Sequence, residues 1–420
     1  GLAAADTGWR DFFRDPKLTE LIARALVNNR DLRVAVANVE RARAQYRIVR
    51  ADRLPAVGAS AVMTRGGDGP QLAPQYSVGL GITAFELDLF GRVRNLSDAA
   101  LQQYFAQEEA RRAAQLALVA EIANAYLTLG ADRELQQLAR DTLANRRKAL
   151  ELAERQHELG AVSALDLSQA QTAAETARTD VARFAGQVAR DINALNLLVG
   201  APVEEALLPQ RFGADTASLG MLPAGLPAEV LLRRPDVLQA EHQLRAANAD
   251  IGAARAAFFP SISLTASIGS ASNELSGLFS SGTRAWSFVP QVNLPIFQGG
   301  RLRAALGMSQ AERDAALAQY EKSIQNGFRE VADALALGST LAEQKEAQQA
   351  LVAAAARADQ LSRARYEAGR DSYLVLLDAQ RTLYSAQQSL VTTRLAEQSN
   401  RVALYQVLGG GWHEYSRNAQ

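Results

Sequence analysis

The chain contains two copies of one pattern, and this duplication constrains its fold more than any other feature. Residues 30–62, RDLRVAVANVERARAQYRIVRADRLPAVGASAV, match residues 235–267, PDVLQAEHQLRAANADIGAARAAFFPSISLTAS, at a constant offset of 205. Later in each copy, Gly160 matches Gly369 at an offset of 209. Self-similarity on this scale indicates that each copy builds the same structural unit. We place the two repeats at residues 1–199 and 228–409. A Pro/Gly-rich linker at 200–227, which would form an equatorial region, separates them, and a tail at 410–420 follows.

Helices are predicted for most of each repeat. A first helix of about thirty residues is expected to end before Pro55 or Pro260, because proline cannot continue a helix. After a hairpin, each copy continues as helix for about a hundred residues, broken only at Gly160 or Gly369, the first and second elbow. A continuous helix from Arg92 to the first elbow would be about 100 Å long. Three leucines of the second copy repeat every seven residues and predict a coiled-coil seam: Leu376, Leu383 and Leu390.

Between these helices, each copy has two stretches that alternate apolar and polar residues. They predict β-hairpins at about 57–88 and about 261–297. In SISLTASIGS the apolar face carries Ile262, Leu264, Ala266 and Ile268, and the other face carries only serine and threonine up to Ser267. Tyr76, Trp286 and Phe288 fall on the apolar faces of the other strands, so we expect these three to face lipid.

The hairpins favour a membrane barrel, although a small sheet packed beneath the helices is an alternative. Strands of about ten residues, with Pro290 and Pro295 in one of them, are typical of a barrel wall with a wet lumen. Four strands cannot close a barrel, and an open edge in a bilayer costs several kcal/mol for each unpaired backbone group. The barrel must therefore be shared between copies. Two copies give eight strands and a filled interior, whereas three give twelve strands and an open bore, which we favour.

Composition narrows the function classes. The 45 basic and 45 acidic residues balance, so nucleic acid is not an expected partner. The absence of cysteine fits an oxidising compartment. No run of eighteen apolar residues predicts a transmembrane helix, and no secretory signal segment opens the chain. With only His157, His242 and His413, neither a metal site nor a catalytic triad is expected. An enzyme and a cofactor are therefore not predicted.

Several segments resemble a known family. They include GWRDFFRDPKL at 8–18, TAFELDLFGRVR at 83–94, GAARAAFFPSISLTA at 252–266 and LYQVLGGGWH at 404–413. The chain resembles the outer-membrane factors of tripartite RND-type drug efflux pumps, the TolC-like family, and most closely its OprM branch. The loop RGGDGPQLAP at 65–74 looks short for that branch.

The resemblance implies a mainly α-helical chain with four β-strands, assembled as a homotrimer. A twelve-strand barrel in the outer membrane would continue as a periplasmic α-helical barrel. This channel would passively conduct drugs and other small molecules expelled by an inner-membrane RND pump through a periplasmic membrane-fusion adaptor protein. The branch also implies a lipoprotein, with the lipid on a cysteine upstream of Gly1. Two alternatives stay open: a TolC-like channel for protein secretion or metal-ion efflux, and a periplasmic coiled-coil scaffold without a pore.

The resemblance also implies a gate at the second elbow, nearest the channel axis. Leu374 and Asp378, one helical turn apart, would form stacked apolar and anionic rings. Three carboxylates about 6 Å apart repel by roughly 3 kcal/mol per pair, so the anionic ring should bind a cation or a proton. Arg381 and Tyr366 would tie neighbouring helices, with Asp166 of the first elbow as a partner. The alternative is that all five are ordinary seam and surface positions of a coiled coil.

The small and exposed residues at the two elbows are, by resemblance, the contact points for the adaptor's hairpin tips. They are Gly160, Ala161, Gly369 and Arg370. Asp371 replaces a basic residue that some relatives carry after the glycine, so we expect no gate pair built on that position.

Overall fold

The computed structural model describes residues 6–66, 74–213, 219–220 and 232–416. Parts of the linker, the tip of the loop at 65–74 and the end of the tail lie outside these residues. The chain divides into two compact units, and each is described separately. Unit 1 comprises Gly1–Val34, Arg111–Pro235 and Ile324–Gln420, and unit 2 comprises Ala35–Ala110 and Asp236–Ser323.

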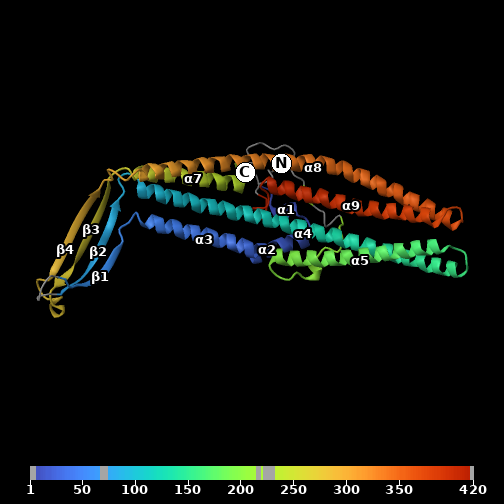
Figure 1. Cartoon of the computed structure of the whole chain (residues 1–420), viewed down its shortest axis with the longest axis horizontal. Helices are drawn as coiled ribbons and strands as arrows, with labels where there is room; N and C mark the ends of the chain where they lie inside the picture. The colour runs from blue at the N-terminus through green and yellow to red at the C-terminus, as the bar shows by residue number, and fades with distance from the viewer. Residues whose placement is uncertain (1–5, 67–73, 214–218, 221–231, 417–420) are drawn as a thin grey trace. The chain divides into compact units, whose positions relative to one another are not determined.

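Unit 2 contains one antiparallel sheet of four strands in the order β1-β2-β3-β4 (Figure 1). The strands are β1 (Val57–Thr64), β2 (Gln75–Leu87), β3 (Ser261–Ser272) and β4 (Arg284–Asn293). Two strands therefore come from each repeat, and β2 pairs with β3 across the repeats. The predicted hairpins are confirmed, but β4 ends at Asn293 rather than near 297. Pro295 lies outside the strand, whereas Pro290 lies within β4, an edge strand in which a residue without an N–H is tolerated.

The strand register carries the apolar and polar faces across the whole sheet. One row of paired residues reads Ala59, Leu80, Ile268 and Trp286. The next row, on the opposite face, reads Gly58, Gly81, Ser267 and Ser287. The alternation predicted within single strands thus becomes one apolar and one polar surface.

A β-bulge interrupts the pairing of β2 with β3 between Ile82 and Phe85. Within it Ala84 has a φ of 48°, and its N–H donates to Thr265 Oγ1 at 3.1 Å. An extra residue in a bulge bends the strand. Here the bulge also keeps Ile82 and Phe85 on the apolar face, although an odd number of residues would otherwise invert that face.

The first helix of each repeat is shorter than predicted. α3 (Arg30–Ala51) and α7 (Pro235–Ala256) each have 22 residues, not about thirty. α3 is separated from α2 (Pro16–Asn28) at Asn29, whose Oδ1 accepts the N–H of Leu32 at 2.8 Å. This side-chain bond satisfies a free donor of the new helix and favours a break at that point.

The long helices preserve the duplication residue for residue. α4 (Arg92–Glu158) and α8 (Arg301–Glu367) both have 67 residues and are related by the offset of 209. After the elbows follow α5 (Ala164–Val199) and α9 (Tyr373–Val407). Within unit 1, α4 and α5 form one antiparallel hairpin and α8 and α9 another (Figure 1). Short helical segments complete the described elements: α1 (Trp9–Phe12), η2 (Glu205–Leu207) and η3 (Leu275–Gly277).

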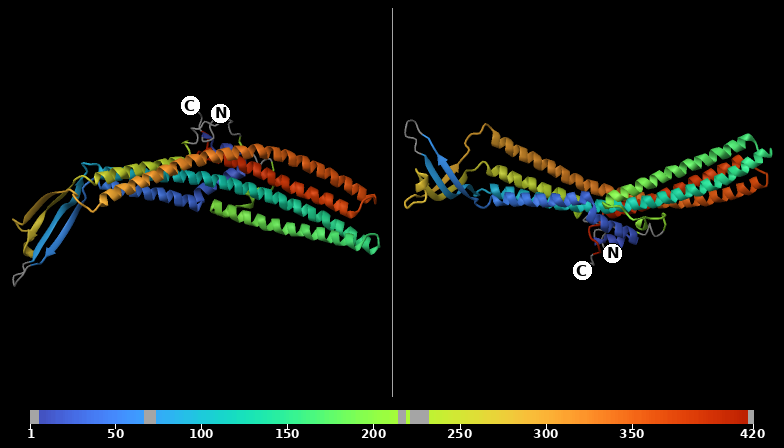
Figure 2. Two further views of the ribbon diagram at one scale, coloured as in Figure 1. Left: turned by 45° about the horizontal axis from the view of Figure 1, so that its top comes forward. Right: turned by 90° about the horizontal axis from the view of Figure 1, so that it is seen from below.

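The main core of unit 1 joins the start of the chain to α4, α5 and α9. Phe12 stacks on Tyr405 with ring centroids 3.9 Å apart, and Tyr126 donates to the buried Asp15 at 2.8 Å. The N–H of Trp9 bonds the carbonyl of His413 at 2.9 Å, so the two ends of the described chain lie side by side (Figure 2). This core fastens the N-terminal segment to the end of the second repeat.

One helix among the described residues, α4, is long and apolar enough by composition to cross a membrane. The sequence analysis expected none. More than half of its most apolar window is buried inside the structure. The buried side chains of this region include Leu118, Val119, Ile122 and Leu127, which belong to the main core of unit 1. Packing therefore accounts for the apolar composition of α4.

Candidate functional site at the helical elbows

Both elbows have the same backbone geometry. At the first, Gly160 has a φ of 70°, and the N–H groups of Gly160 and Ala161 bond the carbonyls of His157 at 2.9 Å and Gln156 at 2.7 Å. At the second, Gly369 has a φ of 67° and repeats this pair of bonds. This is the Schellman motif, in which a left-handed glycine closes a helix. The repeated glycine therefore sets the chain reversal in both copies.

The two elbows differ in how the next helix begins. At the first, Ser163 and Asp166 form a capping box: the N–H of Asp166 donates to Ser163 Oγ at 3.1 Å, and Ser163 in turn donates to the carboxylate. At the second, Ser372 makes no side-chain cap. Instead Arg365 binds Asp371 with two bonds of 2.6 and 2.9 Å, and this pairing holds the pKa of Asp371 below its usual range. No gate pair was expected at Asp371, and this local ion pair was not predicted from the sequence.

Apolar packing joins the two elbows. A buried cluster is formed by α4, α5 and α9, with Tyr366 of α8 packed against it; its members are Ala153, Ala170, Ala173, Tyr373, Leu376 and Leu377. Tyr366 meets Tyr373 edge to face at 5.7 Å. Burial raises the pKa of Tyr366, with smaller contributions from Tyr373 and Asp166. The structure therefore brings Tyr366 and Asp166 near each other within one chain.

The remaining gate candidates project away from this cluster. Leu374 is 52% exposed, whereas Leu377 beside it is 1% exposed. Asp378 and Arg381 are exposed and fall on the Leu374 face of α9. The described part of the chain shows no ion pair between Arg381 and Asp166. Leu374, Asp378 and Arg381 are therefore free to contact another molecule.

The duplication distinguishes the second elbow from the first. At the offset of 209, Leu374 corresponds to Leu165, but Asp378 corresponds to Gln169 and Arg381 to Thr172. The first elbow thus has the exposed leucine, 66% exposed, without the charged pair. The four residues assigned to adaptor contact, Gly160, Ala161, Gly369 and Arg370, are all exposed.

Polar contacts tie the second hairpin to the first beyond the elbows. Arg146 of α4 is only 7% exposed and donates to Gln380 of α9. Tyr384 donates to Asp180 of α5 at 3.1 Å, and burial raises its pKa to about 12. A cavity of about 270 Å³ lies beside Arg146 and Tyr384. No sequence signal marks these contacts, because their partners are more than two hundred residues apart.

A pair of carboxyl groups lies between α4 and α5. Burial, together with the neighbouring carboxyl group of Asp191, raises the pKa of Asp132 to about 7. Asp191 Oδ1 accepts from Gln187 at 3.0 Å, while its buried Oδ2 accepts no hydrogen bond from the protein. The two carboxyl groups therefore interact across the contact of α4 with α5.

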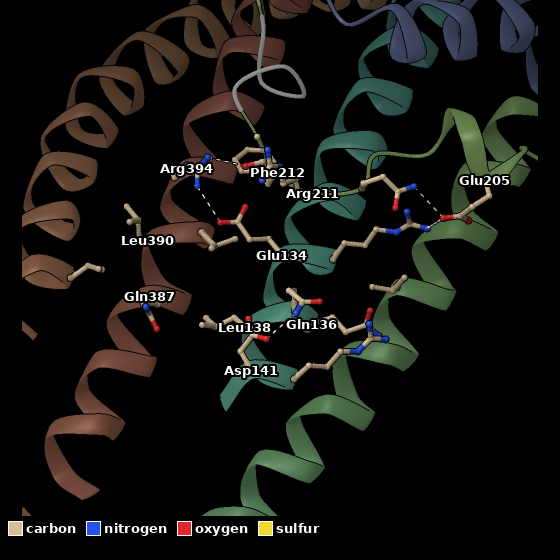
Figure 3. A pocket seen from close by; sticks show the side chains of 18 residues that line it. Glu134, Gln136, Leu138, Asp141, Glu205, Arg211, Phe212, Gln387, Leu390 and Arg394 are labelled. Atoms are coloured by element: carbon tan, nitrogen blue, oxygen red, sulfur yellow. Dashed lines mark hydrogen bonds and ion pairs between the residues drawn. The ribbon is translucent and has the colours of Figure 1, made fainter. Parts of the chain in front are cut away.

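A larger cavity, of about 870 Å³, opens between α4 and α9 beside the segment after η2. Arg394 reaches across its wall to Glu134 at 3.3 Å and to the Phe212 carbonyl at 2.8 Å (Figure 3). Arg133 holds Glu205 at 2.7 Å. These bonds anchor the linker end of the first repeat to both hairpins.

On the sheet, the three residues expected to face lipid share the apolar face. Trp286 is 74% and Phe288 58% exposed, and Tyr76 is half-buried. The opposite face, lined by serine, threonine and glycine, carries the bond between Ser267 Oγ and Ser287 Oγ at 2.8 Å. A sheet with one exposed apolar face and one polar face, joined to two long helical hairpins, is typical of outer-membrane channel proteins.

The comparisons with known proteins agree with that class. Residues 21–201 and 226–410 match the family model described as outer membrane efflux protein. The antibiotic efflux pump outer membrane protein ArpC of Pseudomonas putida is 50% identical, over 100% of this chain and 88% of the relative. The toluene efflux pump outer membrane protein TtgC of the same species is 49% identical over the same shares. The open state of the MtrE outer membrane channel of Neisseria gonorrhoeae superimposes with a TM-score of 0.90 at 40% identity, over 100% of this chain and 94% of MtrE.

The chain therefore belongs to the outer membrane efflux protein family. It is an outer-membrane channel of an efflux pump that extends into the periplasm, and it is not an enzyme.

Proposed function

We propose that three copies of the chain assemble into one channel, the exit duct of a tripartite multidrug efflux pump. The observation that carries the proposal is the open sheet. In the described residues β1 pairs only with β2 and β4 only with β3, so both edges carry unpaired backbone groups. Within a bilayer such edges must be paired, and pairing β4 of one copy with β1 of the next supplies the partner. Three copies give twelve strands and an open bore.

The two faces of the sheet support the same assembly. The apolar face, with Tyr76, Trp286 and Phe288, turns to the outer membrane lipid. The polar face, which includes Ser267 and Ser287, lines the lumen. Lipid-facing apolar residues that alternate with polar lumen residues are the pattern of a membrane barrel.

We place the gate at the second elbow. Three copies of Leu374 form an apolar constriction, and three copies of Asp378 form an anionic ring one turn away. Arg381 reaches a neighbouring copy, while Tyr366 and Asp166 hold the two elbows of one chain together. The support is the exposure of Leu374, Asp378 and Arg381 and the absence of the charged pair from the first elbow.

The exposed elbow residues Gly160, Ala161, Gly369 and Arg370 receive the hairpin tips of a periplasmic adaptor. That adaptor connects the channel to an inner-membrane RND pump. The pump selects the cargo, and the channel conducts it passively. The names of the relatives, which refer to antibiotic and toluene efflux, indicate small drugs and solvents as the cargo class.

Planar-bilayer recording of the purified full chain tests the proposal. The mass of the detergent-solubilised particle should correspond to three copies, and the particle should conduct. Leu374→Ala should raise the single-channel conductance and admit vancomycin into cells. The matched control is Leu165→Ala, which changes the corresponding exposed leucine of the first elbow and should do neither.

A monomeric, non-conducting particle would identify a periplasmic scaffold instead. Equal effects of the two alanine variants would contradict the placement of the gate at the second elbow.

A further inference from the structure

All four connections between strands and helices lie at one end of the sheet. β1 begins there at Val57, β2 ends at Leu87, β3 begins at Ser261 and β4 ends at Asn293. The register agrees, because Leu87 pairs with Ile262 and Ser261 pairs with Asn293. We call the four connecting segments, residues 50–56, 86–94, 255–260 and 294–303, the junction collar; all of them belong to unit 2.

The junction collar exposes a belt of large apolar side chains. Phe297 is 88% exposed, Ile296 92% and Leu54 71%. Phe90 stacks on Phe259 at 4.8 Å, yet both rings remain about half exposed. These residues flank the ends of the strands, so in the proposed channel the belt lies where the membrane-spanning sheet meets the helices.

Beside this belt the collar carries a local excess of positive charge. Its 32 residues contain seven arginines and three carboxylates, whereas the whole chain is balanced at 45 and 45. Two of the three carboxylates are already engaged. Glu86 binds Arg92 through two bonds of 2.9 and 2.5 Å, and Asp88 accepts the N–H groups of Val93 and Arg94.

Most of the arginines are left without an anionic partner. Four exposed arginines make no side-chain hydrogen bond or ion pair within the described chain: Arg50, Arg53, Arg255 and Arg303. Arg301 binds only the amide oxygen of Gln298, and Arg94 approaches Asp98 at 3.9 Å. Exposed guanidinium groups next to an apolar belt can bind a ligand that has an anionic head and apolar tails.

We propose that the junction collar binds the headgroups of anionic phospholipids in the leaflet that faces the helices. The belt inserts among the acyl chains, and the arginines contact the phosphates just outside it. The planar guanidinium group can bind phosphate through two parallel hydrogen bonds, and aromatic rings favour the interface between acyl chains and headgroups. The inference rests on the proposed function, since it requires the strands to span the membrane.

Retention of lipid by the delipidated full-length assembly tests this proposal. Native mass spectrometry should show that phosphatidylglycerol is retained at least about tenfold better than phosphatidylcholine, given the typical attraction of each basic residue for an anionic surface. Replacing Arg50, Arg53, Arg255 and Arg303 together with glutamine should abolish this preference. Replacing them with lysine should restore most of it.

The matched control changes four exposed arginines of unit 1 to glutamine: Arg147, Arg155, Arg178 and Arg357. These changes should leave lipid retention intact. The proposal is overturned if the collar variant keeps the preference, or if inorganic phosphate displaces phosphatidylglycerol, which would indicate a phosphate site rather than a lipid site. Bilayer conductance recorded on the same samples tests the proposed channel separately. A variant that loses its lipid preference but still conducts would therefore leave the proposed function intact.

Discussion

At the scale of single residues, the elbows depend on two glycines in the left-handed region. A Cβ at Gly369 would meet no other atom within 4 Å, but its φ of 67° is strained for any L-residue with a side chain. There is room for a side chain at Gly369, but the backbone conformation there favours glycine, and the conformation determines the residue type.

Gly369→Ala should consequently destabilise the chain, by about 1 kcal/mol. Gly186→Ala is the matched control, because Gly186 lies within α5 and is equally free of neighbours. There alanine removes the helix penalty of glycine, so stability should rise by about 0.5–1 kcal/mol. Thermal unfolding followed by circular dichroism distinguishes the two. Shifts of the same sign would contradict the role given to the glycine.

At the scale of elements, the α4–α5 hairpin contains two interacting carboxyl groups, Asp132 and Asp191. The folded pKa of Asp132, about 7, lies well above its ordinary value of 3.8. The folded hairpin therefore holds its proton more tightly than the unfolded chain does. This contribution to stability is complete below about pH 4 and is lost as the pH rises through about 7, where Asp132 loses its proton.

In Asp132→Asn the unfolding temperature should decrease less between about pH 4 and pH 7 than in the parent chain. At pH 8 the variant should be more stable, because asparagine carries no charge. Asp141→Asn, on the exposed surface of the same helix, should leave the pH profile unchanged. Unfolding temperatures measured at unit steps of pH provide the check. If Asp132→Asn left the pH dependence of the unfolding temperature unchanged, another group would have to cause that dependence.

The contact of β2 with β3, which joins the two repeats, requires glycine. A Cβ at Gly269 would lie 2.1 Å from the Val78 carbonyl and 2.6 Å from the Cα of Gly79. Gly269→Ala should therefore force the strands apart and reduce the heat-stable trimer expected on semi-native gels. Gly66→Ala, beyond the end of β1 and with open space around it, should preserve that trimer. Intact oligomer for Gly269→Ala would show that this close approach is not needed.

At the scale of the whole molecule, the proposed barrel places lipid and lumen on opposite faces of the sheet. Ile268 and Ser267 are adjacent in β3 but lie in rows on opposite faces. Arginine at a lipid-facing position costs about 2–4 kcal/mol near the bilayer midplane, whereas lumen positions tolerate polar change. Ile268→Arg should thus prevent insertion into the outer membrane, while Ser267→Arg should insert and lower the conductance. Membrane fractionation and bilayer recording measure the two effects, and equal insertion of both variants would contradict the assignment of faces.

Much of this organisation could be predicted from residue patterns that are local or repeated. The duplication predicted α4 and α8, which match to the residue, and the period-two alternation predicted all four strands. Of the three leucines of the predicted coiled-coil seam in α9, Leu376 is buried and Leu383 and Leu390 are half-buried. Asp166 was predicted only as a gate partner, whereas the structure shows it in a capping box with Ser163.

The repeat, the two elbows and the alternating faces follow from local sequence, because each depends on a period or on a single backbone conformation. The packing of the folded chain determines which distant groups meet: Arg146 with Gln380, Tyr384 with Asp180, and Asp132 with Asp191. It also decided that β2 pairs with β3 across the repeats, in a register that extends one apolar face over four strands. Such contacts depend on how helices and strands pack in space, and spacing along a chain does not encode that arrangement.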